Sequence, residues 1–162
     1  MATTHQYRFR KVTPDDLAML ASWQSNPHVR QWWEREPYNE ADLADPRVSR
    51  WIVLNGDRPF AYMQDYSVHG WQDHPFFYLP AGARGIDQFI GDPEMIGAGH
   101  GSAFIALRMR TLFGEGVPVI ATDPHPGNLR AVAVYKKLGF EPVGAPQQTQ
   151  WGLVLPMLAK RA

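Results

Sequence analysis

Cysteine is absent from this 162-residue chain, which excludes disulfides, thiolate zinc sites and a cysteine nucleophile. No charge of one sign prevails, because 16 Lys and Arg balance 16 Asp and Glu. Without a basic excess or a Lys/Arg run, nucleic acid is not favoured as a partner. No apolar run approaches the length that spans a bilayer, and the N-terminus MATTHQYRFRKV has no apolar signal-peptide region. We therefore expect a soluble, cytoplasmic protein without membrane contact.

Metal-ligand spacing is also missing. The six histidines show no spacing that suits a metal, so no metal site is predicted. His100 stands between glycines and His125 between prolines, and both are predicted to lie in solvent.

What is present fits one α/β domain over residues 1–162. The chain is 44% apolar and 20% charged, which is the globular range. Alternation and short apolar runs predict strands at 7–12, 51–54, 60–66, 85–90, 117–122 and 150–158. Helical spacing predicts helices at 13–21, 27–33, 39–43, from about 102 to 113, and 128–138. That order predicts a mixed α/β fold with a central sheet.

Turn and cap signals support these boundaries. Thr13-Pro14-Asp15-Asp16 is a helix start, with Thr13 as the cap and acids in the first turn. Asn55-Gly56 favours a type I′ hairpin turn. Residues 67–83 hold His, Trp, Pro and Gly, and predict a long loop of the kind that is usually functional or mobile.

The segment 96–102 reads IGAGHGS, with three glycines at alternate positions before an expected helix. Free N–H donors and the helix dipole favour an anion there, and glycine clears its approach. A P-loop would need a lysine, which is absent. A dinucleotide fingerprint fits Gly97 and Gly99 but has Ser102 as its third position, with Asp123 downstream. The other readings are an acyl-CoA pyrophosphate loop and a turn shaped only by chain geometry.

A second segment, 121–140, reads ATDPHPGNLRAVAVYKKLGF. On a helix Asn128, Ala131, Val132 and Tyr135 share one face. The pattern P-x-N-x-x-A-x-x-x-Y-x-K-x-G-F resembles the C-terminal half of the GNAT superfamily of N-acetyltransferases. The resemblance implies the GNAT fold, a central mixed twisted sheet flanked by helices, and acetyl-CoA as co-substrate. In that family the 96–102 segment is the pyrophosphate loop, although Ile96 replaces the usual Gln or Arg.

Further segments narrow the resemblance. NPHVRQWW (26–33), WIVLNGDRPFAYMQDY (51–66), GARGIDQFIG (82–91) and TDPHPGNLRA (122–131) together are similar to aminoglycoside 6′-N-acetyltransferases of the superfamily. Siderophore-pathway acetyltransferases share the D-P-x-x-x-G-x-G-x-G run from Asp92 to Gly101. The segment 67–81 matches neither group cleanly, and it lies where the acceptor is expected.

The resemblance implies a direct attack of an amine on the thioester. Asp87 is the expected catalytic carboxylate beside the amine. Because a carboxyl group with an ordinary pKa of about 3.9 is a weak base, such a group acts by holding the ammonium, through a raised pKa, or through water. Tyr135 is the expected acid, since a phenol with a pKa near 10 can protonate a thiolate with a pKa near 8.5. A strand-edge Asp and a core Tyr are the structural alternatives.

The predicted coenzyme-binding residues are Gln88, Phe89, Ile90, Ile96, Gly97, Ala98, Gly99, His100, Gly101, Ser102, Asn128, Ala131 and Tyr135. The predicted substrate-binding residues are Trp33, Asp65, Trp71, Asp87 and Asp123, with Asp73 as a further acid. The expected partner is a small cationic amine, led by an aminoglycoside 6′-amine. The alternatives are a siderophore precursor, a polyamine, a peptide amine, or a CoA-binding module without turnover. A monomer and a homodimer are both compatible with the sequence.

Overall fold

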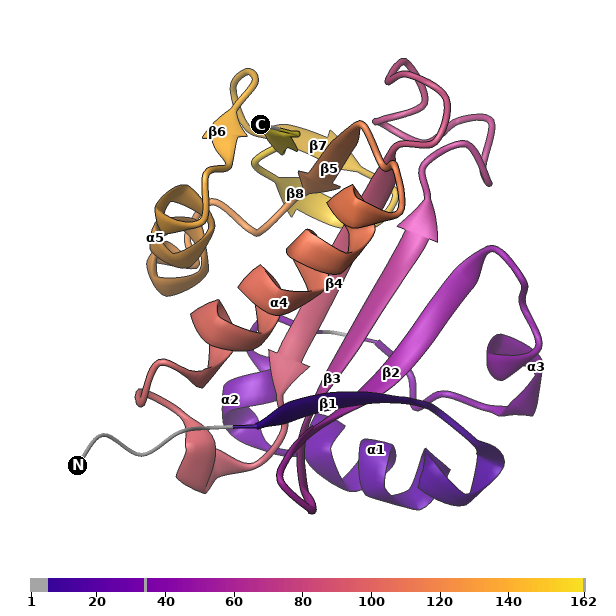
Figure 1. The fold of residues 1–162 in the computed structure, drawn as a ribbon, viewed down its shortest axis with the longest axis vertical. Helices are drawn as coiled ribbons and strands as arrows, with labels where there is room; N and C mark the ends of the chain where they lie inside the picture. The colour runs from indigo at the N-terminus through magenta and orange to yellow at the C-terminus, as the bar shows by residue number, and fades with distance from the viewer. Residues whose placement is uncertain (1–5, 34, 162) are drawn as a thin grey trace. The chain divides into compact units, whose positions relative to one another are not determined.

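The computed structural model describes residues 6–33 and 35–161. Figure 1 follows the chain from indigo β1 to the yellow C-terminal strands. The helices are η1 (Pro14–Asp16), α1 (Leu17–Gln24), α2 (Pro27–Arg30), α3 (Glu40–Leu43), η2 (Pro93–Met95), α4 (His100–Gly114) and α5 (Leu129–Lys137). The strands are β1 (Tyr7–Lys11), β2 (Val48–Asn55), β3 (Arg58–Ser67), β4 (Arg84–Ile90), β5 (Val119–Thr122), β6 (Glu141–Pro142), β7 (Gln147–Thr149), β8 (Gly152–Val154) and β9 (Met157–Lys160).

Seven strands of the described residues form one mixed sheet in the order β1-β2-β3-β4-β5-β9-β6. β1 runs antiparallel to β2, with Phe9 opposite Val53. β4 and β5 are parallel, with Arg84 opposite Ile120, while β9 is antiparallel to both β5 and β6. The predicted α/β class with a central mixed sheet flanked by helices is confirmed.

Two compact units are defined by internal contacts. The first holds the described residues of Met1–Gln64 with Asp87–Phe104, and the second holds those of Asp65–Ile86 with Ile105–Ala162. The chain passes between the units within β3, β4 and α4. The prediction of one domain over 1–162 stays a prediction.

The core of the first unit is an aromatic and aliphatic cluster under α1 and α2. Its buried members are Leu20, Val29, Ile52, Leu54, Tyr62 and Phe89. Half-buried side chains pack around it, namely Val12, Met19, Trp23, Trp33 and Tyr38. This packing, rather than propensity, stabilises short helices such as α2, which Asn26-Pro27 separates from α1 as predicted.

The second unit takes its core from α4 and from strands that are buried on both faces. β5 is buried along its whole length. On α4 the buried residues Ile105, Arg108, Met109 and Leu112 follow the i, i+3, i+4, i+7 spacing of an inward-facing stripe. Arginine within such a stripe requires a buried anionic partner.

The predicted helix start at Thr13 is confirmed. Thr13 and Asp16 form a capping box, in which the Asp16 carboxylate accepts from the Thr13 backbone N–H at 2.8 Å. At the other end of the chain, Asn128 caps α5 by accepting from Ala131 N at 3.2 Å, and Gly139 follows α5 with φ +101°, as its C′ position predicts.

Two expectations are wrong. The single strand at 150–158 is instead the β7–β8 hairpin followed by β9, because Gly152 takes φ +112° and reverses the chain. The type I′ turn at Asn55-Gly56 is also wrong. Asn55 still belongs to β2, and Gly56 has φ +61°, whereas no non-glycine residue of the described chain has a positive φ. A type I′ turn requires positive φ at both central residues.

Candidate active site

The three alternate glycines differ in whether the backbone conformation requires glycine. Gly97 and Gly99 have φ of +77° and +85°, so the backbone itself requires glycine at both positions. Gly101 lies in the first turn of α4 without a positive φ, and a Cβ there would meet Ile90 Cδ1 at an ordinary 3.7 Å. Chain geometry therefore explains the glycines at 97 and 99 but not the one at 101.

His100 is buried between these glycines, so the prediction that it lies in solvent is wrong. Its Nδ1 is 2.7 Å from the Tyr7 hydroxyl, and its ring lies 5.5 Å from that of Phe60. Burial raises the pKa of Tyr7. Through these contacts the imidazole holds the first residue of α4 against Tyr7 and Phe60. Gly97, Ala98 and Gly99 are exposed, and Ile96, Gly101 and Ser102 are half-buried. His125 is exposed, as predicted.

Asp87 is half-buried on β4 and is joined to the neighbouring strand. Its Oδ2 accepts from Gln64 Nε2 at 3.0 Å. Gln64 is itself bonded to Tyr62 and Arg50. Phe89, two residues on, packs in the core 5.0 Å from the Trp33 ring, and the Ile90 carbonyl lies 2.8 Å from His28 Nε2. The alternation of β4 thus directs Asp87 and Phe89 to one face.

Trp33 is half-buried against the core cluster of the first unit. Its ring packs edge-on against Tyr62 at 6.0 Å, as well as against Phe89. Within the described residues, Trp33 Nε1 and Arg50 Nε are buried without a hydrogen-bond partner. Buried donors without partners call for an acceptor oxygen from water or a ligand. The sequence prediction included Trp33 but missed Arg50.

Asp65 does not lie where a substrate contact needs it. It is 1% exposed, and its carboxylate accepts from Arg84 Nε at 2.9 Å and from Arg108 Nη2 at 2.8 Å. Two guanidinium groups already neutralise it, so direct binding of a cationic substrate is contradicted. The arginine in the buried stripe of α4 is the signal that could have predicted this pairing.

Tyr135 lies on the inward face of α5. It is 5% exposed and packs edge-on against Phe140, with ring centroids 5.3 Å apart. Ala131 and Val132 on the same face are half-buried, whereas Leu129, the first residue of the helix, is 76% exposed. The predicted amphipathic face of α5 is confirmed.

Asp123 directly follows β5 and is half-buried. The residue before it, Thr122, is buried and donates from Oγ1 to the Ile86 carbonyl on β4 at 3.2 Å. This bond fixes the carboxyl end of β5, where Asp123 emerges.

The predicted loop after β3 contains aromatic residues that pack on one another. Trp71 is half-buried, 5.8 Å from the Tyr66 ring, and His74 is buried 5.2 Å from Trp151 on the β7–β8 turn. Phe77 and Tyr78 are exposed.

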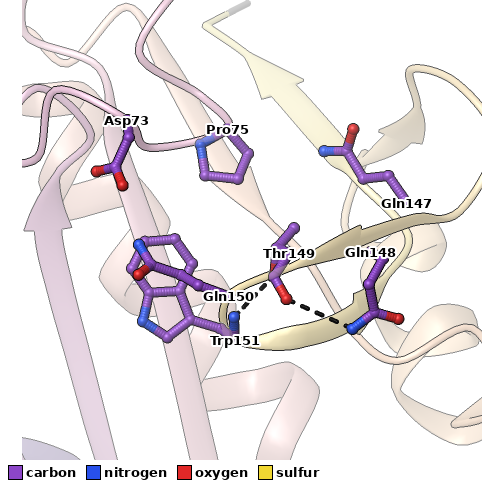
Figure 2. A pocket seen from close by; sticks show the side chains of 7 residues that line it. All are labelled: Asp73, Pro75, Gln147, Gln148, Thr149, Gln150 and Trp151. Atoms are coloured by element: carbon purple, nitrogen blue, oxygen red, sulfur yellow. Dashed lines mark hydrogen bonds between the residues drawn. The ribbon is translucent and has the colours of Figure 1, made fainter.

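A pocket of about 300 Å³ opens between this loop and the β7–β8 hairpin (Figure 2). It combines a carboxylate, an indole, a hydroxyl and side-chain amides, the groups that recognise polar rings and ammonium groups. Its lining residues are Asp73, Pro75, Gln147, Gln148, Thr149, Gln150 and Trp151.

The α/β architecture, the glycine turn before α4 and the inward tyrosine of α5 define an acetyltransferase domain. Residues 13–147 match the family model of the acetyltransferase (GNAT) domain, and the chain belongs to this family. An aminoglycoside N(6′)-acetyltransferase type 1 from Klebsiella pneumoniae is 34% identical over 151 residues, covering 83% of this chain and 74% of the relative.

The fold is also similar to solved structures of aminoglycoside acetyltransferases. AAC(6′)-Ib in complex with ribostamycin and coenzyme A superposes with a TM-score of 0.85 and 32% identity, over 96% of this chain and 93% of the other. AAC(6′)-Ib in complex with coenzyme A and kanamycin superposes with a TM-score of 0.83 and 32% identity, over 96% and 95% of the two chains.

The described residues hold no group of three or more His, Cys, Asp or Glu side chains arranged to bind a metal ion. Among residues 6–33 and 35–161, no helix is both long and apolar enough to cross a membrane.

Proposed function

We propose that this protein transfers the acetyl group of acetyl-CoA to the 6′-amine of an aminoglycoside. The observation that carries the proposal is the 34% identity to an aminoglycoside N(6′)-acetyltransferase over 83% of the chain. The neighbouring structures with coenzyme A and either ribostamycin or kanamycin support both the donor and the acceptor. A cytoplasmic location, where acetyl-CoA is available, is part of the proposal.

The coenzyme's pyrophosphate would bind at the start of α4. Gly101 supports this role because neither its φ nor its surroundings exclude a side chain. Free N–H groups and the helix dipole would then meet the negative charge. The backbone of Gln88, Phe89 and Ile90 would polarise the acyl carbonyl.

In the proposed reaction the neutral amine attacks the thioester carbonyl, the C–S bond breaks, and the amide forms. Asp87 would hold the acceptor ammonium and receive or relay its proton, while the Tyr135 hydroxyl would protonate the leaving thiolate. Gln64 supports the role of Asp87, because it occupies Oδ2 and leaves Oδ1 for the acceptor.

The acceptor's further ammonium and hydroxyl groups would be bound by Asp123 and by the pocket beside Trp151. Asp73, the glutamine amides and the indole face of that pocket support binding of an amino sugar. Asp65 takes no part in this binding.

Steady-state acetyl transfer tests the proposal with an aminoglycoside, a polyamine, a peptide amine, a hydroxylamine-type siderophore precursor and a simple mono-amine. We expect the highest kcat/KM with the aminoglycoside. Asp123→Asn and Trp151→Ala should raise KM for the aminoglycoside much more than for the mono-amine, and Asp87→Asn should lower kcat for both.

Two outcomes contradict the proposal. Preference for another acceptor would assign the enzyme to that substrate. If coenzyme A binds but no amine is acetylated, the chain is a CoA-binding module.

A further inference from the structure

A chain of hydrogen bonds within the first unit joins Arg50 on β2 to Asp87 on β4. Arg50 Nη1 donates to the Tyr62 hydroxyl at 2.9 Å and to Gln64 Oε1 at 3.2 Å. The Tyr62 hydroxyl donates to the same Oε1 at 2.7 Å. Gln64 Nε2 then donates to Asp87 Oδ2 at 3.0 Å. The series has a cation at one end, an anion at the other and neutral groups between them.

The direction of this chain depends on which end of the Gln64 amide faces Asp87. A glutamine amide can present either its oxygen or its NH₂ group to a neighbour. Only the NH₂ group can donate to a carboxylate, whereas the amide oxygen would repel it. Arg50 is donor-only, so it selects the oxygen of Gln64 for its own side and leaves the NH₂ group for Asp87.

Arg50 also fixes the direction of the Tyr62 hydroxyl. Because the guanidinium donates to the Tyr62 oxygen, the hydroxyl proton is directed to Gln64. Burial raises the pKa of Tyr62 above its ordinary value, so the hydroxyl is protonated at neutral pH. Without Arg50 the hydroxyl could accept from the amide as well as donate to it.

The guanidinium is itself held in place. Its Cζ lies 4.8 Å from the centre of the Tyr38 ring, a cation–π distance. The Tyr38 ring packs against that of Tyr62 at 5.3 Å. Gln64 is 4% exposed, so water does not compete strongly for its amide. Because the Arg50 Nη1, Tyr62 hydroxyl and Gln64 Nε2 donors each have a defined acceptor in a buried setting, this series of bonds holds one arrangement.

We propose that Arg50 is a positioning residue for acetyl transfer, acting through Tyr62 and Gln64 to hold the Asp87 carboxylate toward the acceptor amine. The inference rests on the proposed function, because it assigns Asp87 to the acceptor. Arg50 contacts no reacting atom in this proposal. Its loss should disturb the alignment of the attacking amine, which affects kcat, and should leave coenzyme binding unchanged.

The kinetic test compares Arg50→Met with Arg8→Met, an exposed arginine on β1 paired with exposed Asp57. Both variants are first shown to be folded by thermal melting. We expect Arg50→Met to lower kcat about ten-fold, the effect of about one charge-assisted hydrogen bond, with KM for acetyl-CoA unchanged. Arg8→Met should match the unsubstituted protein.

A double-mutant cycle with Gln64→Leu separates positioning from a general loosening of β2. If Arg50 acts through Gln64, Arg50→Met causes no further loss in the Gln64→Leu background. An equal loss in both backgrounds, or a folded Arg50→Met protein with undiminished kcat, would overturn the inference.

A measurement without turnover keeps the inference separate from the proposed function. The side-chain ¹H–¹⁵N signals of Gln64, assigned by their disappearance in Gln64→Leu, should shift or double in Arg50→Met and shift in Asp87→Asn. Unchanged Gln64 signals in Arg50→Met would reject the positioning role whatever the substrate. Shifted signals in a protein that acetylates no amine would instead reject the proposed function alone.

Discussion

At the residue scale, Gly101 shows how a glycine can be assigned to a ligand. A glycine in a helix costs roughly 0.5–1 kcal/mol relative to alanine. Gly97 and Gly99 lie in the turn before α4, where their positive φ values favour glycine, whereas Gly101 lies within α4 and a Cβ there would meet only an ordinary contact. The unexplained cost at Gly101 supports a ligand at the start of α4.

Tyr135→Phe should separate the hydroxyl of this residue from its packing. The ring contact with Phe140 remains in the variant, so the free energy of unfolding should change little. Loss of a general acid lowers kcat by about 100-fold, at the low end for such groups, while acetyl-CoA affinity is nearly kept. Steady-state kinetics and calorimetry measure the two effects.

Leu129→Ala, at the exposed first residue of α5, is the matched control and should retain full activity. A Tyr135→Phe protein with unchanged rates across the pH range would limit Tyr135 to a wall of the coenzyme site.

At the element scale, β3 serves both units through its alternation. Gln64 and Asp65 are adjacent, so their side chains point to opposite faces of the strand. Gln64 reaches Asp87, and Asp65 reaches Arg108 on α4. The same strand thereby carries a group that bonds to the candidate catalytic carboxylate and a charge that stabilises the fold.

Two strand-end glycines should not accept alanine. A Cβ on Gly85 would overlap the Tyr66 ring, and a Cβ on Gly91 would overlap the Trp23 ring. We expect each Gly→Ala variant to lose about 1–3 kcal/mol of unfolding free energy, the usual cost of overpacking. Urea unfolding measures the loss.

The control for these variants is Gly114→Ala at the end of α4, where a Cβ would meet nothing within 4 Å. Alanine there should be neutral or stabilising. Equal losses at all three positions would show that the aromatic overlaps are not the cause.

The start of α1 should make stability depend on pH. The Arg10 guanidinium, hydrogen-bonded to Asp16 at 2.8 Å through both carboxylate oxygens, lowers the pKa of Asp16. A lowered folded-state pKa gives stability that is present above the ordinary pKa of about 3.9 and is lost as pH falls through the lowered value. Arg10→Met should therefore cost about 1 kcal/mol at neutral pH and progressively less below about pH 4.

Urea unfolding of both proteins between pH 7 and pH 3 measures this difference. A difference that stays constant over that range would mean that the pair contributes through packing and not through charge.

Local signals predicted most elements, and residues distant in sequence explain the failures. Thr13-Pro14 and Gly139 lie where helix boundaries are expected, because caps depend on adjacent residues. The burial of Asp65 depends on Arg84 and Arg108, which are 19 and 43 residues away. His100 depends likewise on Tyr7, 93 residues away. A polar residue that the sequence predicts to be exposed can thus be buried where the fold brings a distant hydrogen-bond or ion-pair partner to it.

The candidate site was predicted unevenly for the same reason. Asp87, Tyr135 and the glycines belong to segments with a recognisable pattern. Arg50 lies outside those segments, and Gln64 lies within 51–66 without a pattern that singles it out. Their arrangement depends on the pairing of β2, β3 and β4, which only the sheet order supplies.

At the scale of the whole molecule, zero formal charge means that attraction for a cationic acceptor must arise locally. Acetyl-CoA binding should raise the thermal stability of the whole protein. At a concentration 100 times its Kd, a ligand stabilises the native state by about 2.7 kcal/mol. For a domain of this size the Tm should rise by roughly 5–10 °C.

Gly101→Val should abolish most of that rise while leaving the Tm of the free protein nearly unchanged, since a Cβ at this position meets only an ordinary contact. Thermal melts with and without acetyl-CoA measure both quantities. A folded Gly101→Val protein with the full ligand-induced rise would contradict the assignment of the pyrophosphate loop.

The buried pairing of Asp65 with Arg84 and Arg108 has a consequence for how such sequences diverge. Removing one partner leaves an uncompensated buried charge, whereas a well-packed apolar trio in its place is often no less stable. Single replacements at these positions should therefore be selected against, although the joint replacement is not. Related sequences that diverge from this one should therefore either keep all three residues or have replaced all three.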